Sequence, residues 1–428
     1  MTIGMIIGRI GGIDGVALEA EKWIHVLRRM GHEVYILSGQ YQERPMNHEF
    51  ETLVPEMSFF SPESFWSQKK AFFHPDTDLD ELKAHIFLYS NIIANKIKAW
   101  VKDKKLQLLI SENASSLPSH LEMGFGIRKA AQQLDIPIIT HDHDFAWERG
   151  DRYLSPHEDI NRFIAENFPL RLPNSYHAVI NTNAQRTLLE KYGRDAVVVP
   201  NVMNFDQPFG EITEKNKNLR ENLGFDKNDI LLFQITRIVS RKAIEVAIEL
   251  VHRLDDPRLK LIITGSQADD EGNRYYQKLV DLIHDLKLGS QVRFASDNFH
   301  NRGLHGQNRE INYSLSDAYA HARACTYFST YEGFGNAFVE AVLARTPIFV
   351  NNYKPVFWPD IGSKGFKTVM LENNRLTGEK VREMAEIIYN DELNREIGEY
   401  NFQLGKKYFS YDVLEQKLHE LIRHTGLA

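Results

Sequence analysis

Residues 324–350 read ACTYFSTYEGFGNAFVEAVLARTPIFV and decide the fold class of this chain. One apolar run opens the stretch and another closes it, and a glycine-containing loop between them leads into a helical pattern. A strand, a helix and a second strand in this order are typical of a parallel βαβ unit, because strands buried on both faces read as nearly continuous apolar runs. We therefore expect a parallel sheet covered by helices in this part of the chain.

The same alternation continues in both directions. Further apolar runs start at residues 230, 259, 291 and 367 in the second half, and at residues 5, 33, 106, 136, 178 and 196 in the first half. Residues 16–30 illustrate the helices between them. One face of this stretch carries apolar residues at helical spacing, and Gly31 stands at the expected C-cap; the apolar residues are Ala20, Trp23, Ile24, Leu27 and Met30. The pattern predicts an α/β protein with two doubly wound, Rossmann-like, parallel-sheet domains.

The domain boundary is expected in a polar stretch. Residues 205–229 contain no strand-like run and several turn residues, so we interpret them as a linker between domains 1–205 and 206–409. The last helix, 410–428, is expected to pack back on the first domain. Two segments do not follow the alternation and are expected to be loop excursions, namely residues 50–86, rich in aromatics and prolines, and residues 298–313, rich in His, Asn and Gly.

Composition excludes several classes of function. The formal net charge of −7 argues against a surface that binds nucleic acid. The one cysteine, Cys325, excludes an internal disulfide and fits a reducing compartment such as the cytoplasm. No stretch approaches the ~20 apolar residues of a membrane span, so we expect a cytoplasmic protein without stable membrane insertion. A homo-oligomer is compatible with all of this.

Polar side chains after the strands of the second half are candidates for chemistry, because ligands of such sheets bind at the carboxyl ends of the strands. Arg237 and Lys242 stand five residues apart across a strand-to-helix turn, where they suit a diphosphate or are simply solvated. Glu332 follows a strand and would face a sugar, while Glu340 on the next helix can accept the two hydroxyls of a ribose.

In the first half, two motifs follow strands. The sequence HDHDFAWER, residues 141–149, contains an H-x-H pair that suits either a metal ion or a sugar-binding histidine beside basic residues for an acidic acceptor; we favour the sugar. The loop GRIGGIDG, residues 8–15, precedes a helix and suits either an anion at the helix N-terminus or only a tight turn.

The segment EGFGNAFVE, residues 332–340, resembles the signature of glycosyltransferase family 4, retaining enzymes of the GT-B fold, in which two glutamates are separated by seven residues. The resemblance extends over most of the chain. Residues 11–39, the VVVPNVM at 197–203 and the spacing from Arg237 to Lys242 are all similar to that family. His143 stands six residues after Pro137, as the family's donor-sugar histidine commonly does.

This resemblance implies roles for individual residues. Arg237 and Lys242 would hold the donor diphosphate, Glu340 the ribose, and Glu332 the transferred sugar. His143 would contact that sugar near its 6-hydroxyl, and Gly12 would approach the phosphate. Backbone amides of the loop would complete the site, from Gly333, Phe334, Gly335 and Asn336. The chain departs from the family in having Ala243 where glycine is usual and a longer stretch at 298–313, which leaves the donor base open.

The expected reaction transfers a glucosyl or mannosyl group from UDP- or GDP-hexose to a small hydroxylated acceptor such as a sugar, a sugar phosphate or glycerate. Arg149, Arg152 and Asp144 are the candidate acceptor residues. Two fixed cations can stabilise the departing diphosphate, so we expect neither a metal nor another cofactor.

Three rival interpretations stay open at this point. A nucleotide-sugar epimerase of the same fold would turn over the donor without any acceptor. A nicotinamide-dependent dehydrogenase is disfavoured because the G-x-G-x-x-G spacing is absent. A non-catalytic sugar-binding relative is disfavoured because both basic residues and both glutamates of the expected site are present.

Overall fold

The computed structural model describes residues 1–12, 14–266, 273–299 and 313–427. These residues form two compact units, 1–200 with 411–428, and 201–410. Residues 201–205 therefore belong to the second unit, whereas the sequence placed them in the first. Local packing accounts for the difference, because the Met203 amide donates to the Phe409 carbonyl at 2.8 Å and the Phe205 ring packs on Phe402.

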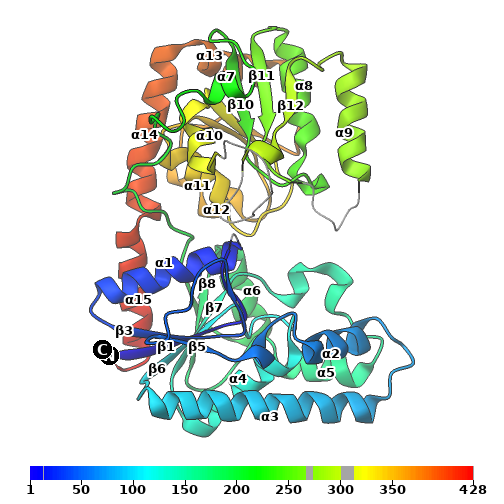
Figure 1. Cartoon of the computed structure of the whole chain (residues 1–428), viewed down its shortest axis with the longest axis vertical. Helices are drawn as coiled ribbons and strands as arrows, with labels where there is room; N and C mark the ends of the chain where they lie inside the picture. Colours follow the sequence, from blue (N-terminus) through cyan, green and yellow to red (C-terminus); the bar gives the residue numbers. More distant parts are fainter. Residues whose placement is uncertain (13, 267–272, 300–312, 428) are drawn as a thin grey trace. The chain divides into compact units, whose positions relative to one another are not determined.

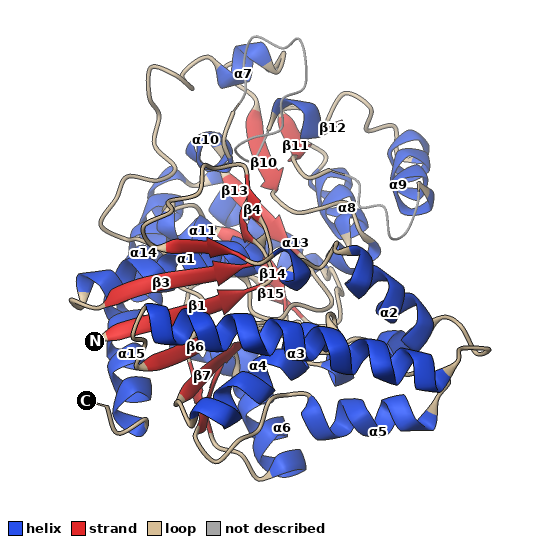
Figure 2. Cartoon of the chain, turned by 60° about the horizontal axis from the view of Figure 1, so that its bottom comes forward, coloured by secondary structure: helices blue, strands red, loops and turns tan. Residues whose placement is uncertain are grey.

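The first unit is built on a seven-stranded parallel sheet with the order β5-β3-β1-β6-β7-β8-β9. All six strands predicted for this half are present and largely buried, and they span Thr2–Ile7 (β1), Glu33–Ser38 (β3), Leu108–Glu112 (β6), Ile138–Asp142 (β7), Ser175–Val179 (β8) and Ala196–Val198 (β9). Short strands Ile10–Gly11 (β2) and Tyr41–Gln42 (β4) pair beside it. Figure 2 shows β3, β1, β6 and β7 side by side in this order.

The prediction that residues 50–86 lie outside the α/β scaffold is wrong in part, because a strand of this segment joins the main sheet. It holds the edge strand Glu51–Leu53 (β5), the helix Pro62–Phe72 (α2) and the start of Leu79–Asp103 (α3). A three-residue edge strand is too short to show an alternation of its own.

Helices cover both faces of this sheet. Figure 1 shows α1 (Gly15–Arg29) and α15 (Tyr411–His424) on one face and α3 and α4 (Leu121–Leu134) on the other. The helix predicted at 16–30 is confirmed: it buries Ala20, Trp23 and Leu27 and ends before Gly31, whose φ is +83°. The remaining helices of this unit are Glu158–Asn167 (α5) and Thr182–Tyr192 (α6).

The second unit repeats the architecture with a six-stranded parallel sheet of order β12-β11-β10-β13-β14-β15. Every predicted strand is present, spanning Ile230–Gln234 (β10), Leu259–Ile263 (β11), Val292–Phe294 (β12), Ala324–Tyr327 (β13), Ile348–Asn351 (β14) and Met370–Leu371 (β15). The predicted linker, 205–229, is instead a packed part of this unit. It contains the short helix Leu219–Asn222 (α7), and the buried Asn216 donates to Asp317 at 2.8 Å.

Helices again cover both faces, with α8 (Ile244–Leu254) and α9 (Arg274–Asp285) on one side of the sheet and α10 (Leu315–His321) and α11 (Asn336–Leu343) on the other (Figure 1). The unit also contains Phe357–Asp360 (α12), Gly378–Tyr389 (α13) and Asp391–Phe409 (α14). Most of the second predicted excursion, 298–313, lies outside the described residues. Within the described part of the chain, none of the helices combines the length and the apolar character needed to cross a bilayer.

Candidate functional site

Two neighbouring strands of the second unit place the predicted polar residues at one edge of its sheet. Strand β10 runs into the 3₁₀ turn Ser240–Lys242, and its neighbour β13 runs into the loop that carries Glu332. The amide of Thr330 in this loop donates to the carbonyl of Arg241 at 2.8 Å. A turn and a loop that are 90 residues apart are thereby tied together by their backbones.

Glu332 and Lys242 form a buried ion pair at this junction. Only 9% of Glu332 and 7% of Lys242 are exposed, and the Lys242 ammonium donates to one carboxylate oxygen of Glu332. Arg241 donates to the other oxygen at 2.9 Å and also to the carbonyl of Tyr331. The Lys242 ammonium lies over the Tyr327 ring, 5.2 Å from its centre. The sequence predicted Lys242 and Glu332 as separate site residues and did not predict that they pair. It did not single out Arg241.

The electrostatics of this pair keep the carboxylate charged. Burial opposes ionisation of Glu332, but the charges of Lys242 and Arg241 outweigh it and lower the pKa of the carboxyl. Burial also lowers the pKa of the Lys242 ammonium, and the charge of Glu332 acts against that shift. The result is a fixed carboxylate between two cationic side chains in a place that water barely reaches.

Arg237 lies at the start of the same turn but is exposed. Its charge is close enough to Lys242 to lower the pKa of that lysine. The turn fits closely against the end of β11, because a Cβ on Gly265 would lie 1.9 Å from the carbonyl oxygen of Thr236. Gly265 therefore lets the backbone that carries Arg237 approach the sheet.

Ala243 ends the turn in the left-handed conformation, with φ 45° and ψ 50°. Glycine adopts this conformation without cost, whereas an alanine is strained there. The departure noted in the sequence is therefore a strained position directly after Lys242.

The glycine loop is shaped by its surroundings in the second unit. Gly335 has a φ of +147°, and a Cβ there would lie 2.3 Å from the Tyr353 hydroxyl, which donates to the Phe334 carbonyl at 2.8 Å. The Phe334 ring packs edge-on against Phe409. Asn336 starts α11 and accepts a hydrogen bond from Asn201 at 2.8 Å. The N-cap residue of α11, Gly335, has no side chain that could cap this helix start.

Glu340, one turn further along α11, is half-buried and accepts a hydrogen bond from the Tyr319 hydroxyl at 3.1 Å. Tyr319 is itself buried beside Tyr327, the tyrosine that hydrogen-bonds Glu332. The two glutamates of the predicted motif are therefore linked through buried tyrosines. The structure thus brings Lys242, Glu332, Arg237 and Glu340 into one neighbourhood of the second unit.

In the first unit, the H-x-H motif meets a carboxylate that sequence reasoning missed. Glu112, the last residue of β6, is 1% exposed and lies beside the end of β7. His143 Nε2 is 2.7 Å from Glu112 Oε1, and His141 Nδ1 is 2.9 Å from the same carboxylate. His141 also stacks on Trp23, with ring centres 4.0 Å apart.

These three side chains are close enough together to be considered as metal ligands, since their ligand atoms lie within 4.8 Å of one another. Two ligand atoms that share a tetrahedral zinc ion stand about 3.4 Å apart, because each lies about 2.0–2.1 Å from the metal. The observed nitrogen-to-oxygen distances, 2.7 and 2.9 Å, are instead those of charge-assisted hydrogen bonds. We therefore describe the group as a hydrogen-bonded triad.

The triad shifts the pKa values of the two histidines in opposite directions. Burial opposes ionisation of Glu112, but the charges and hydrogen bonds of the histidines outweigh it and lower the pKa of the carboxyl to about 2. Burial lowers the pKa of His141. It acts in the same direction on His143, but the hydrogen bond and charge of Glu112, together with Glu19 and Asp144, raise the pKa of His143 overall.

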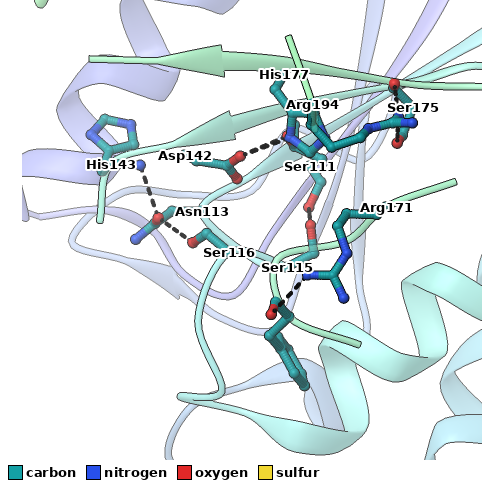
Figure 3. A network of polar contacts seen from close by, with 12 residues as sticks. Ser111, Asn113, Ser115, Ser116, Asp142, His143, Arg171, Ser175, His177 and Arg194 are labelled. Atoms are coloured by element: carbon teal, nitrogen blue, oxygen red, sulfur yellow. Dashed lines mark hydrogen bonds and ion pairs between the residues drawn. The ribbon is translucent and has the colours of Figure 1, made fainter. Parts of the chain in front are cut away.

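Asn113 holds the backbone of the same motif. Its side-chain oxygen accepts hydrogen bonds from the His143 amide at 3.1 Å and from the Ser116 hydroxyl at 2.8 Å (Figure 3). Asn113 itself has a φ of 47°, a left-handed conformation in which asparagine is the most tolerated residue after glycine. On the opposite face of β7, Asp142 pairs with His177 (Figure 3).

The remaining predicted residues of the first unit lie in two loops. Gly12 has a φ of +70°, and the helix start after it is capped by Asp14, whose carboxylate accepts from the amides of Val16 and Ala17. A carboxylate of the chain therefore occupies the helix N-terminus at which the sequence suggested an anion.

Of the predicted acceptor residues, Arg149 forms an ion pair with Asp144, and Arg152 is exposed beside the Tyr153 ring. Glu148, between them, was missed by sequence reasoning; burial raises the pKa of its carboxyl to about 7.

Comparisons with known proteins agree with this architecture. The family model described as glycosyl transferases group 1 matches residues 215–404. A mannosylglucosylglycerate synthase from Thermotoga maritima is 32% identical over 98% of this chain and 99% of its own length, and one from Petrotoga mobilis is 32% identical over 87% and 86%. A Rickettsia africae glycosyltransferase superposes with a TM-score of 0.65 over 99% of this chain and 98% of its own, at 15% identity. An Anabaena protein solved in complex with UDP-glucose superposes with a TM-score of 0.62 over 99% and 100%, also at 15% identity.

The two parallel sheets, the polar strand ends and these similarities define a GT-B glycosyltransferase. More narrowly, residues 215–404 are a glycosyl transferases group 1 domain, and the chain belongs to the family of the two mannosylglucosylglycerate synthases.

Proposed function

We propose that this chain is a retaining, metal-independent glycosyltransferase that transfers a mannosyl group from a nucleotide-diphosphate donor to glucosylglycerate. The acceptor and the sugar follow from the names of the two relatives that are 32% identical to it. They support the small, carboxylated acceptor expected from the sequence, and they favour mannosyl over glucosyl as the transferred sugar.

One observation carries the proposal: the Glu332 carboxylate is buried between Lys242 and Arg241 where two adjacent parallel strands end. A buried ion group of this kind seldom adds net stability compared with apolar residues of similar volume. Its presence at the ligand-binding edge of a parallel sheet supports a role in binding a charged substrate.

In the proposed reaction, the bond from the sugar's anomeric carbon to the diphosphate oxygen breaks, and a bond from that carbon to the acceptor oxygen forms on the same face. The acceptor's proton passes to the departing phosphate oxygen, so no protein base is required. Lys242 and Arg237 stabilise the negative charge that grows on the diphosphate, a kind of interaction worth about 3–4 kcal/mol for a single fixed donor. Glu332 orients the sugar and Glu340 holds the ribose.

The same groups support the proposed metal independence. Negative charge on a leaving diphosphate is balanced either by a divalent ion or by fixed cationic side chains. Three cationic side chains, Arg237, Arg241 and Lys242, lie on one turn after β10, and they supply that balance from the protein.

The test is transfer by the purified chain from a panel of UDP-, GDP- and ADP-hexoses to glucosylglycerate, glycerate and a neutral disaccharide. We expect a mannosylated glucosylglycerate whose anomeric configuration, read by NMR coupling constants, matches that of the donor. A product of opposite configuration would refute retention. Donor turnover that proceeds equally without any acceptor would favour an epimerase instead.

A further inference from the structure

Glu112 is the most completely enclosed carboxylate beside the motif that carries His143. It lies at the end of β6, where its carboxylate meets His143 Nε2 at 2.7 Å and His141 Nδ1 at 2.9 Å. Both ring nitrogens must carry a proton to make these contacts, because an ionised carboxylate only accepts. The contact therefore sets the tautomer and the ring orientation of each histidine.

For His143 this leaves one polar ring atom available. Because Nε2 is held by Glu112, only Nδ1 can meet a substrate, and it accepts a hydrogen bond when the ring is neutral and donates one when the ring is protonated. Only 8% of the His143 side chain is exposed, so the ring has little freedom to turn and offer the other edge.

The backbone of His143 is held as firmly as its ring. Asn113, the neighbour of Glu112, accepts a hydrogen bond from the His143 amide at 3.1 Å, and it does so from a left-handed conformation (Figure 3). Unusual backbone conformations persist where the surrounding structure requires them. Two consecutive residues at the end of β6, Glu112 and Asn113, thus hold the ring and the main chain of one histidine.

Four titratable side chains surround the His143 ring. The groups that face it are Glu112 from β6, His141 from β7, Asp144 from its own loop and Glu19 from α1. Glu19 is 1% exposed and is already paired with Lys22, with 2.5 Å between Nζ and Oε1. Glu112 is therefore the only one of these carboxylates that touches the His143 ring through a described hydrogen bond.

From this geometry we propose that Glu112 and Asn113 are positioning residues for His143, which they hold with its Nδ1 edge toward the transferred sugar of the donor. The inference rests on the proposed function and on the role that the family resemblance implies for His143, which is contact with the transferred sugar. It adds two residues whose effect on transfer acts through the histidine.

The first test compares Glu112→Gln with a matched control, Glu122→Gln. Glu122 is also fully buried in this unit, on α4, but it lies beside His120 and His85 at 3.2 and 3.7 Å. We expect kcat/KM for the sugar-nucleotide donor to fall about 10- to 100-fold in Glu112→Gln, as misplacement of a positioning group does, and to stay near wild type in Glu122→Gln. The Kd for the nucleoside diphosphate, which lacks the sugar, stays unchanged in both. An equal loss of affinity for the diphosphate would overturn the proposal in favour of a general structural role.

A second test removes the histidine. In a His143→Asn background, Glu112→Gln has no further effect on transfer if the carboxylate acts through His143. Independent, multiplicative losses would refute the proposal. Asn113→Gly is a second variant. Glycine suits the positive φ at this position but lacks the side-chain oxygen that accepts from the His143 amide. We expect it to lower kcat/KM for the sugar-nucleotide donor as Glu112→Gln does.

A third measurement is independent of turnover. NMR titration of the labelled imidazoles follows His143 directly, and we expect Glu112→Gln to move its titration to lower pH while Glu122→Gln leaves it in place. An unmoved His143 titration would overturn the role of Glu112. If wild-type protein transferred no sugar at all, the proposed function would fail, whereas this titration would still decide whether Glu112 sets the state of the histidine. Retention of a metal ion by the triad through purification would also count against it.

Discussion

Replacing Lys242 or Arg237 with methionine tests whether each cation serves the proposed transfer reaction, the stability of the fold, or both. Lys242 is buried against Glu332, whereas Arg237 is exposed on the same turn. Methionine keeps the aliphatic part of either side chain and removes only the cation. Both variants are expected to lose transfer, but only one is expected to lose stability.

The magnitudes follow from the contacts. Removing one partner of a buried ion pair costs about 3–5 kcal/mol when the remaining charge is left alone. Glu332 keeps Arg241 at 2.9 Å, so we expect Lys242→Met to cost about 2 kcal/mol, which lowers the melting temperature of a unit of this size by about 4–8 °C. Arg237→Met changes stability by about 0.5 kcal/mol or less, as exposed positions do. Removing either fixed cation is expected to lower kcat about 10²–10³-fold.

The assay combines calorimetric melting with initial rates under saturating donor, measured well below the melting temperature. Lys260→Met is the matched control. The side chain of Lys260 is 14% exposed in the same unit, and its Nζ lies 3.7 Å from a carboxylate oxygen of Asp229, outside the turn that carries Arg237 and Lys242. Near-normal kcat in Arg237→Met, together with a loss in Lys242→Met that follows only its unfolded fraction, would refute the role of these cations.

Four further outcomes are expected. Ala243→Gly relieves the left-handed backbone at φ 45° and raises the unfolding free energy by about 0.5–1 kcal/mol; a lower melting temperature would show that the lost buried methyl dominates. Tyr319→Phe removes the hydroxyl that donates to Glu340 and raises the calorimetric Kd of the nucleoside diphosphate about 5-fold. An unchanged Kd would contradict the proposed role of Glu340 in binding the ribose. Because the folded-state pKa of Glu112, about 2, lies below its ordinary value of 4.5, its carboxylate stabilises the protein above that range and loses this effect as the pH falls from 4.5 toward 2. The difference in melting temperature between wild type and Glu112→Gln therefore becomes smaller as the pH falls from 4.5 toward 2. A difference that stays constant over this pH range would contradict the lowered pKa of Glu112. Prolonged EDTA treatment leaves transfer unchanged, and a loss reversed by manganese would oppose metal independence.

Much of the fold was predictable because strands buried in a parallel sheet read as apolar runs wherever they occur. All twelve runs taken from the sequence became strands of the two large sheets. Strand β5 escaped because three residues, ETL, cannot show a period. The stretch at 205–229 looked like a linker because its packing depends on the buried amide of Asn216, and a polar residue with a buried partner is indistinguishable in sequence from a solvated one.

The candidate site was predictable one residue at a time but not as a set of contacts. Lys242 and Glu332 were selected separately as polar groups after strands, and only the pairing of β10 with β13 brings them together. Arg241 resembles any basic residue of a solvated turn. Glu112 ends the apolar run LQLLISE, which was a usable signal, since a carboxylate directly after a buried strand lies at the same sheet edge as the H-x-H motif.

Each unit keeps one buried glutamate ionised with a pair of cationic or proton-donating side chains at a strand end. Glu332 has Lys242 and Arg241, and Glu112 has His143 and His141. Such groups cost desolvation energy and rarely stabilise a fold more than apolar packing would. Their occurrence at strand ends in both sheets therefore favours a functional explanation for each, and it makes the two glutamates equally good first targets, Glu332 for its direct partners and Glu112 for the histidine it holds.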